Sequence, residues 1–83
     1  MSVFTAIVEY WHEGDQNYRM ETFKRPSRLS ATYVARKALR TGFYRPGYMP
    51  ECARVEDADE RVVAAYEVEV GRIVPKPFGN CDA

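Results

Sequence analysis

The stretch 30-SATYVARKALRTG-42 decides the fold, because it is the clearest amphipathic segment of the chain. Its apolar residues recur at the spacing of one face of an α-helix, and they are Ala31, Val34, Ala35, Ala38 and Leu39. Ser30, with Ser27 as the alternative, can accept the free amides of the first turn, and Gly42 can end the helix in a left-handed conformation. We therefore expect one helix whose stripe of small residues packs closely on a sheet.

A β-hairpin is predicted before this helix. Residues 3–11, VFTAIVEYW, are β-branched and aromatic with no breaker, which is typical of a strand partly covered on both faces. Gly14 and Asp15 follow in a polar run that favours a turn. Residues 18–24, YRMETFK, then alternate along the strand, and Pro26 ends the segment.

A second hairpin is predicted after the helix. Residues 43–50, FYRPGYMP, are expected to be a loop, because their two prolines lack amide donors. The segments 51–56 and 61–70 are predicted strands joined by the acidic turn 57–60. The last strand alternates most clearly, with Val62, Ala64, Tyr66, Val68 and Val70 on one face and Arg61, Val63, Ala65, Glu67 and Glu69 on the other. We expect the face that carries the glutamates to be largely open to solvent and available to a partner.

The order of the elements predicts an α+β fold. A single four-stranded, mostly antiparallel sheet, with the sequence order β-β-α-β-β, can bury one face under one helix. The sequence leaves two pairings open, which are antiparallel throughout or a crossover that sets the second and third strands parallel. Because 83 residues support a single core, we expect residues 1–74 to form one domain and residues 75–83 a poorly ordered tail.

Charge is balanced overall but segregated along the chain. The formal net charge is zero, so the whole molecule has no general attraction to nucleic acid or to an anionic membrane. Residues 24–45 hold seven basic residues and no acid, whereas residues 51–69 hold seven acids and two arginines. Two surfaces of opposite sign are therefore expected.

The cysteines and the hydropathy pattern predict a soluble, cytoplasmic protein. The two cysteines, Cys52 and Cys81, form no CxxC pair, and the N-terminus has no secretory apolar region. We expect both thiols to be reduced and Cys52 to be buried in its strand as a small apolar residue. The chain contains no apolar run of the length that a membrane span needs.

Catalytic and metal-binding chemistry is poorly represented. His12 is the one histidine, and no Ser or Cys lies close to it in the sequence. A zinc site would have to combine His12 with Cys52 and Cys81, which lack the paired short spacings of such sites. The acidic turn lacks the spacing of a calcium loop, and no glycine-rich phosphate motif occurs. We expect no catalytic residue, no metal and no cofactor.

Binding is the remaining class of function. Tyr33, Arg36, Lys37 and Arg40 lie at offsets of zero, three, four and seven, so they form a second helical stripe beside the apolar one. This stripe is a solvated helix back, a protein contact or a nucleic-acid contact. The full set of predicted partner-binding residues is Tyr33, Arg36, Lys37, Arg40, Tyr44, Arg45, Tyr48, Glu56, Asp57, Asp59 and Glu60.

The layout of residues 18–70 resembles that of small phage-encoded accessory proteins of the anti-CRISPR kind. The segments that carry the resemblance are YRMETFK, SRLSATYVARKAL and ARVEDADERVVAAYEVEV. The resemblance is one of layout and not of motif. It implies a non-enzymatic inhibitor that binds a CRISPR effector complex in the host cytoplasm and blocks binding or cleavage of target DNA.

In that interpretation the acidic turn covers basic residues of the effector, and Tyr33, Tyr44 and Tyr48 anchor the contact. Electrostatic complementarity of this kind sets association rate and partner choice more than affinity. The alternative is a small nucleic-acid-binding domain that uses the basic helix. A third possibility is a homodimer formed through an edge strand.

Overall fold

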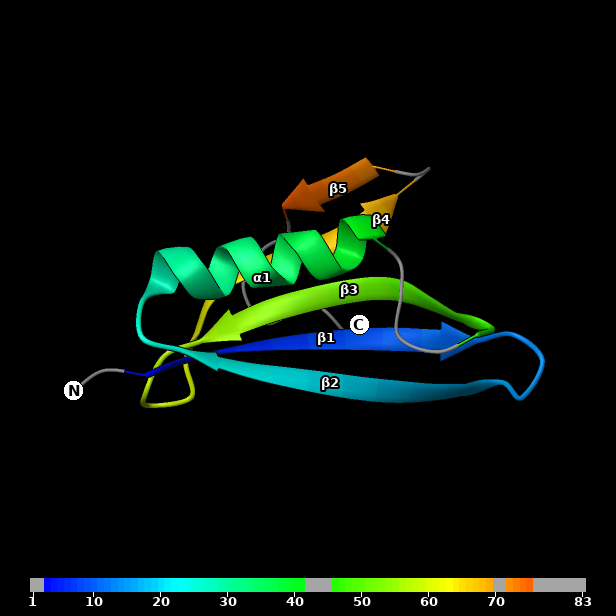
Figure 1. Cartoon of the computed structure of the whole chain (residues 1–83), viewed down its shortest axis with the longest axis horizontal. Helices are drawn as coiled ribbons and strands as arrows, with labels where there is room; N and C mark the ends of the chain where they lie inside the picture. The colour runs from blue at the N-terminus through cyan, green and yellow to red at the C-terminus, as the bar shows by residue number, and fades with distance from the viewer. Residues whose placement is uncertain (1–2, 42–45, 70–71, 76–83) are drawn as a thin grey trace.

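The computed structural model describes residues 3–41, 46–69 and 72–75, which form five strands and one helix (Figure 1). The elements are β1 (Phe4–His12), β2 (Asn17–Arg25), α1 (Arg28–Thr41), β3 (Tyr48–Glu56), β4 (Val62–Glu69) and β5 (Arg72–Pro75). The sheet has the order β2-β1-β3-β4-β5, and every neighbouring pair is antiparallel. The predicted α+β class, with one helix on one face of an antiparallel sheet, is confirmed.

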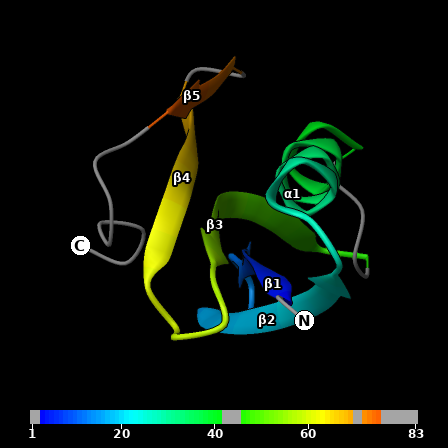
Figure 2. The same cartoon turned by 90° about the vertical axis from the view of Figure 1, so that its left-hand side faces the viewer.

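β1 joins the two hairpins, because it pairs with β2 on one side and with β3 on the other. The second and third strands are therefore not neighbours, and the alternative of a parallel crossover between them is wrong. Figure 2 shows the sheet curling from β2 up to β4 and β5, so that α1 lies against its concave face. The sequence could not settle this order, since the pairing of β1 with β3 joins segments that are far apart in the chain.

The expected four-stranded sheet has a fifth strand. β5 pairs with the end of β4, from Tyr66 opposite Pro75 to Glu69 opposite Arg72. Ile73 packs against the core from this strand. The four residues, RIVP, do not alternate between polar and apolar, which explains why the sequence did not reveal the strand. Pro75 is its last residue, so the first residue of the predicted tail 75–83 belongs to a strand, and residues 76–83 lie outside the described residues.

β3 begins earlier than the sequence predicted. The segment expected to be a loop ends inside this strand, with Tyr48 opposite His12 and Pro50 opposite Tyr10. The register shifts between Glu9 and Tyr10, and a bulge of this kind tolerates a proline that would break a regular ladder. The prolines were therefore a misleading signal for this segment.

The helix begins at Arg28 and is capped by Ser27, not by the favoured Ser30. The amide of Ser30 donates to Ser27 Oγ at 3.1 Å, and the amide of Ala31 donates to the Ser27 carbonyl at 3.1 Å. An N-cap residue sits just outside the helix, and Ser30 is already one turn inside it. Gly42, the predicted end of the helix, lies outside the described residues.

The core lies between α1 and the centre of the sheet. Val8, Tyr10 and Val55 are its largest fully buried side chains. The predicted apolar stripe faces them, with Ala31, Ala35 and Leu39 buried and Val34 and Ala38 half-buried. Two of the three buried positions, Ala31 and Ala35, are therefore small residues, as the predicted stripe requires.

Cys52 is buried, at 3% exposure, as expected. It is also disulfide-bonded, so the expectation of a reduced thiol is wrong for this residue. A spacing of two distant cysteines carries no signal for or against pairing, and Cys81 lies outside the described residues. Because disulfides are rare in a reducing cytoplasm, the expected cytoplasmic location stays a prediction.

Candidate functional site

The outer face of α1 carries the predicted cationic stripe. Tyr33, Arg36, Lys37 and Arg40 are all exposed there. Leu29 joins them at the start of the helix, and it is 81% exposed, while Tyr33 is 58% exposed. A shallow hollow of about 270 Å³ is lined by Leu29, Thr32, Tyr33, Arg36 and Arg40. We call the five residues Leu29, Tyr33, Arg36, Lys37 and Arg40 the α1 surface.

Three basic side chains of this helix contact aromatic rings or a backbone carbonyl. The Arg36 guanidinium lies 5.8 Å from the centroid of the Tyr66 ring, and Lys37 Nζ lies 5.9 Å from that of Tyr33. Arg28 Nη2 donates to the Val63 carbonyl at 2.8 Å. Within the described ranges, none of the basic side chains of α1 forms an ion pair. Their positive charge is therefore available to an outside partner.

The acids of the predicted turn have two different environments: Asp57 bonds the backbone of the turn, and Asp59 and Glu60 are exposed. Asp57 Oδ1 accepts the amides of Asp59 and Arg61, each at 2.9 Å, so this carboxylate holds the turn between β3 and β4 together. Glu60 has a φ of 62°, which closes the turn. Asp59 and Glu60 are exposed. Of the four acids predicted to bind a partner, these two are exposed, whereas Glu56 and Asp57 are half-buried.

The fourth acid, Glu56, belongs to an ionic group on the sheet face opposite α1, which the sequence analysis missed. Arg54 Nε lies 2.9 Å from Glu56 Oε2, and Arg54 Nη1 lies 3.3 Å from Glu9 Oε2. Glu9 is only 9% exposed. Ile7 and Ala65 are also buried on this face, at 7% and 3%. The expectation of a largely open face is therefore wrong at its centre, where Ile7, Glu9 and Ala65 are buried.

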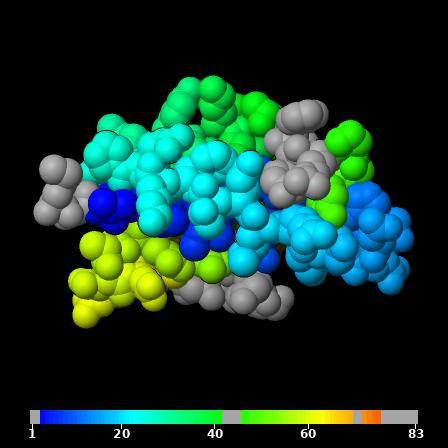
Figure 3. Space-filling view, turned by 60° about the horizontal axis from the view of Figure 1, so that its bottom comes forward, coloured from blue at the N-terminus to red at the C-terminus, as the bar shows by residue number. Residues whose placement is uncertain are grey.

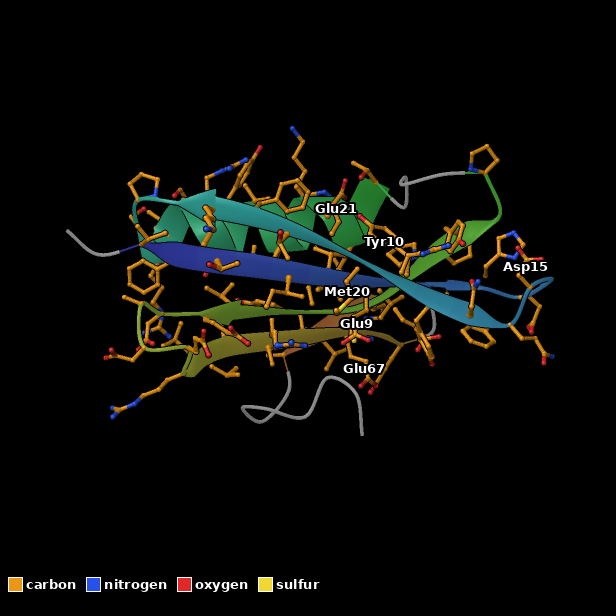
Figure 4. All side chains as sticks on the ribbon, turned by 90° about the horizontal axis from the view of Figure 1, so that it is seen from below. Glu9, Tyr10, Asp15, Met20, Glu21 and Glu67 are labelled. Atoms are coloured by element: carbon orange, nitrogen blue, oxygen red, sulfur yellow. The ribbon has the colours of Figure 1, made fainter. Side chains whose placement is uncertain are left out.

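Figure 4 shows how the opposite face continues outward from Glu9, with Met20 on β2 and Glu67 on β4. Met20 is 59% exposed. The row Met20, Glu9 and Glu67 could be identified only from the strand order, because its members come from the three strands β2, β1 and β4. A correct prediction of the β1–β3 pairing would have been the signal that located it.

A partly exposed aromatic pair, half-buried Trp11 and exposed Tyr18, lies at one end of the same face. The rings of Trp11 and Tyr18 have centroids 4.7 Å apart, and Met49 lies opposite Trp11 on β3. The Tyr18 hydroxyl donates to Glu51 Oε1 at 3.3 Å. The negative charge of Glu51, followed by desolvation and this hydrogen bond, raises the pKa of Tyr18 above its ordinary value.

Tyr48, a predicted anchor, is half-buried and contacts other residues of the chain. Its ring packs 4.8 Å from the His12 ring, and its hydroxyl donates to Asn17 Oδ1 at 3.3 Å. His12 is itself engaged, since its Nδ1 accepts the amide of Asp15 at 2.9 Å. Tyr48 is therefore less suited to anchor a partner than Tyr33. The other predicted residues of this region, Tyr44 and Arg45, lie outside the described residues.

Residues 3–41, 46–69 and 72–75 contain neither a cluster of metal-binding side chains nor a membrane-spanning helix. Within these ranges no three His, Cys, Asp or Glu side chains converge as a metal site would require. The one helix described there is neither long nor apolar enough to cross a bilayer. Comparison with known protein families, curated proteins and solved structures finds no match to this chain.

Proposed function

We propose that this chain is a non-enzymatic protein-binding domain that docks through the α1 surface on an acidic region of its partner. One observation carries the proposal. Leu29 and Tyr33 are more than half exposed and stand among cations that form no ion pair within the described part of the chain. Tyrosine and arginine are the residues most enriched at interface hot spots, and an exposed leucine gains by burial in any partner pocket.

The composition of the α1 surface favours a protein over a nucleic acid as the partner. Phosphate recognition needs cations and polar donors, and Leu29 offers neither. The chain has no net positive charge with which to attract a polyanion over long range. Apolar anchors within a cationic border are instead typical of a contact with an acidic protein surface.

The resemblance in layout gives this proposal a more specific form. We take the chain to be an inhibitor of the phage accessory kind, whose target is a protein subunit of a CRISPR effector complex. Exposed Asp59 and Glu60 support this form, because acids on a second surface can cover basic residues that the effector uses for DNA. Binding of this kind acts by occupying a surface, at a stoichiometry of about one inhibitor per site.

The test is capture of partners from a nuclease-treated bacterial lysate by the tagged chain. The wild-type chain should retain a protein at stoichiometric yield, and Leu29→Ala with Tyr33→Ala should lose it, because the two anchors are gone. Thr22→Ala, an exposed position on β2, serves as the matched control and should retain it. Equal retention by the Leu29 and Tyr33 variant would overturn the proposal.

The alternative, a small nucleic-acid-binding domain, is distinguished in the same assay. It has one observation in its favour, which is that the basic side chains of α1 are unpaired within the described ranges. It predicts retention of DNA or RNA that disappears with nuclease and weakens steeply with salt. For the inhibitor form, the captured effector should lose binding to its DNA target when an equimolar amount of the chain is added.

A further inference from the structure

The two edges of the sheet differ in how well they are protected against pairing with another strand. β5 is four residues long and ends at Pro75, and both features block pairing at an edge. β2 is nine residues long and contains no proline. Among the described residues it pairs only with β1. Figure 3 shows β2, in light blue to cyan, at the surface along much of the molecule.

We propose that β2 pairs antiparallel with β2 of a second copy of this chain. The twofold axis is perpendicular to the sheet and passes between the two Met20 residues, which lie directly opposite each other. The pairing joins the two sheets into one and places both helices on the same side. It goes beyond the proposed function, because it uses the sheet edge and leaves the α1 surface free.

Charge selects this register from the small set that a twofold axis allows. Directly opposite residues must have their side chains on the same face of the joined sheet. The axis therefore passes between one residue of β2 and the same residue of the second copy, and each register is named by that residue. An axis at Arg19 or at Glu21 sets like charges directly against each other, which is destabilising. An axis at Thr22 sets Arg19 against Arg25. Each of these three registers therefore carries a repulsion.

The Met20 axis has no such conflict. It sets Arg19 opposite Glu21 of the second copy, and symmetry repeats this ion pair on the other side of the axis. Tyr18 then lies opposite Thr22, and seven residues of each copy are paired, from position 17 to position 23. An axis at Phe23 also avoids repulsion, but it pairs only five residues before Pro26 interrupts the ladder.

Glu21 can form the ion pair that this pairing requires. Its Oε1 accepts the hydroxyl of the fully buried Tyr10 at 3.1 Å, and it forms no ion pair within the described ranges. Glu21 is half-buried at an edge, so a cation from a second copy would compensate its charge. Arg19 is exposed on the edge strand, and its Nε donates to the Tyr48 hydroxyl at 3.5 Å.

The exposed apolar side chains of the opposite face fit the same arrangement. Tyr18 is 54% exposed and Met20 is 59% exposed, and both lie on the edge strand. In the joined sheet the two Met20 side chains meet at the axis, with Tyr18 and its Trp11 neighbour beside them. Two separate apolar groups become one strip, and water is removed from its centre.

Sedimentation velocity over a micromolar concentration series tests this pairing with the full chain. The wild-type chain should sediment as a dimer. Arg19→Glu and Glu21→Arg should each weaken the dimer by about tenfold or more, because each turns two attractive pairs into repulsive ones. The double exchange, Arg19→Glu with Glu21→Arg, should restore it. Lys24→Glu lies outside the seven paired residues and should change little.

Two further variants keep the test decisive. Met20→Lys leaves Arg19 and Glu21 intact, sets two cations on the axis and should abolish the dimer, while far-UV circular dichroism confirms that the chain is folded. Arg36→Glu with Arg40→Glu should leave the dimer unchanged, which separates this inference from the proposed use of α1. A monomer at every concentration, or a folded double exchange that stays monomeric, would overturn the proposal.

Discussion

Arg54 is the residue on which the centre of the opposite sheet face depends. Its side chain is 23% exposed and lies between the carboxylates of Glu9 and Glu56, whose side chains, taken without the backbone, are 12% and 20% exposed. A carboxylate this far from water is costly unless a cation and hydrogen bonds compensate it. Glu9 is the more buried of the two, so it depends more on the arginine.

Replacing Arg54 by alanine should therefore lower the free energy of unfolding by about 2 kcal/mol, less than for a fully buried pair because water screens part of the charge. Glu56→Gln is the control and should cost less than about 1 kcal/mol, because Glu9 keeps its counterion. Urea denaturation measures both. Equal, small effects of the two substitutions would contradict this account of the ionic group.

Tyr18 gives a pH-dependent prediction at the same scale. Folding raises the pKa of this residue because of the charge on Glu51, so its neutral form is favoured in the native state. The resulting contribution to stability is present below the ordinary tyrosine pKa and is lost as pH rises through the raised value. Glu51→Gln should bring the pKa of Tyr18 back towards its ordinary value.

Absorbance of the tyrosinate form measures this pKa, and Tyr18→Phe identifies which of the six tyrosines is responsible. The signal is the difference between the titration of each chain and that of its Tyr18→Phe counterpart. A difference titration that is the same with Glu51 and with Gln at this position would show that the charge on Glu51 does not raise the pKa of Tyr18.

Among the elements, the turn before β3 and the tip of the first hairpin hold each other in place. Gly47 has a φ of 89°, a conformation that favours glycine. A β-carbon at this position would lie 2.8 Å from His12 Cδ2 and closer still to His12 Nε2. The start of β3 therefore depends on close contact between the backbone at Gly47 and the imidazole ring.

Gly47→Ala should destabilise the protein by about 2 kcal/mol, partly through backbone strain and partly through this clash. In a His12→Ala background the same change should cost only about 1 kcal/mol, because the strain remains and the clash is gone. Thermal or urea unfolding of the four chains measures the coupling. Additive effects would show that the ring and the turn are not in contact.

Elements with a strong local pattern could be predicted from the sequence. The first hairpin, the buried alanine stripe of α1 and the alternating strand β4 each follow from spacing within one segment. Three other features could not. The pairing of β1 with β3 is long-range, Pro50 at a bulge hides the start of β3, and the four residues of β5 do not alternate.

For the candidate site the same division holds. Tyr33, Arg36 and Arg40 lie on one helix, so their common exposure followed from helical spacing alone. The ionic group around Arg54 and the ring pair of Trp11 and Tyr18 depend on which strands are neighbours. The sequence predicted their residue types, but it gave no register that would bring them together.

The molecule as a whole separates its charges on different surfaces. Arg36, Lys37 and Arg40 lie on the outer face of α1, whereas Glu9, Glu56 and Glu67 lie on the sheet face opposite that helix. The segregation seen along the sequence thus becomes a segregation in space. An acidic partner surface would be oriented towards α1 and away from the sheet, which gives one docking direction.

The most direct test of the central claim is photo-crosslinking from the α1 surface in nuclease-treated lysate. A benzophenone amino acid replaces Tyr33 in one chain and the exposed turn residue Glu13 in a control chain. The account predicts one discrete protein adduct from position 33, competed away by unlabelled wild-type chain and absent from position 13. Equal labelling from both positions, or adducts only to nucleic acid in untreated lysate, would contradict protein docking through α1.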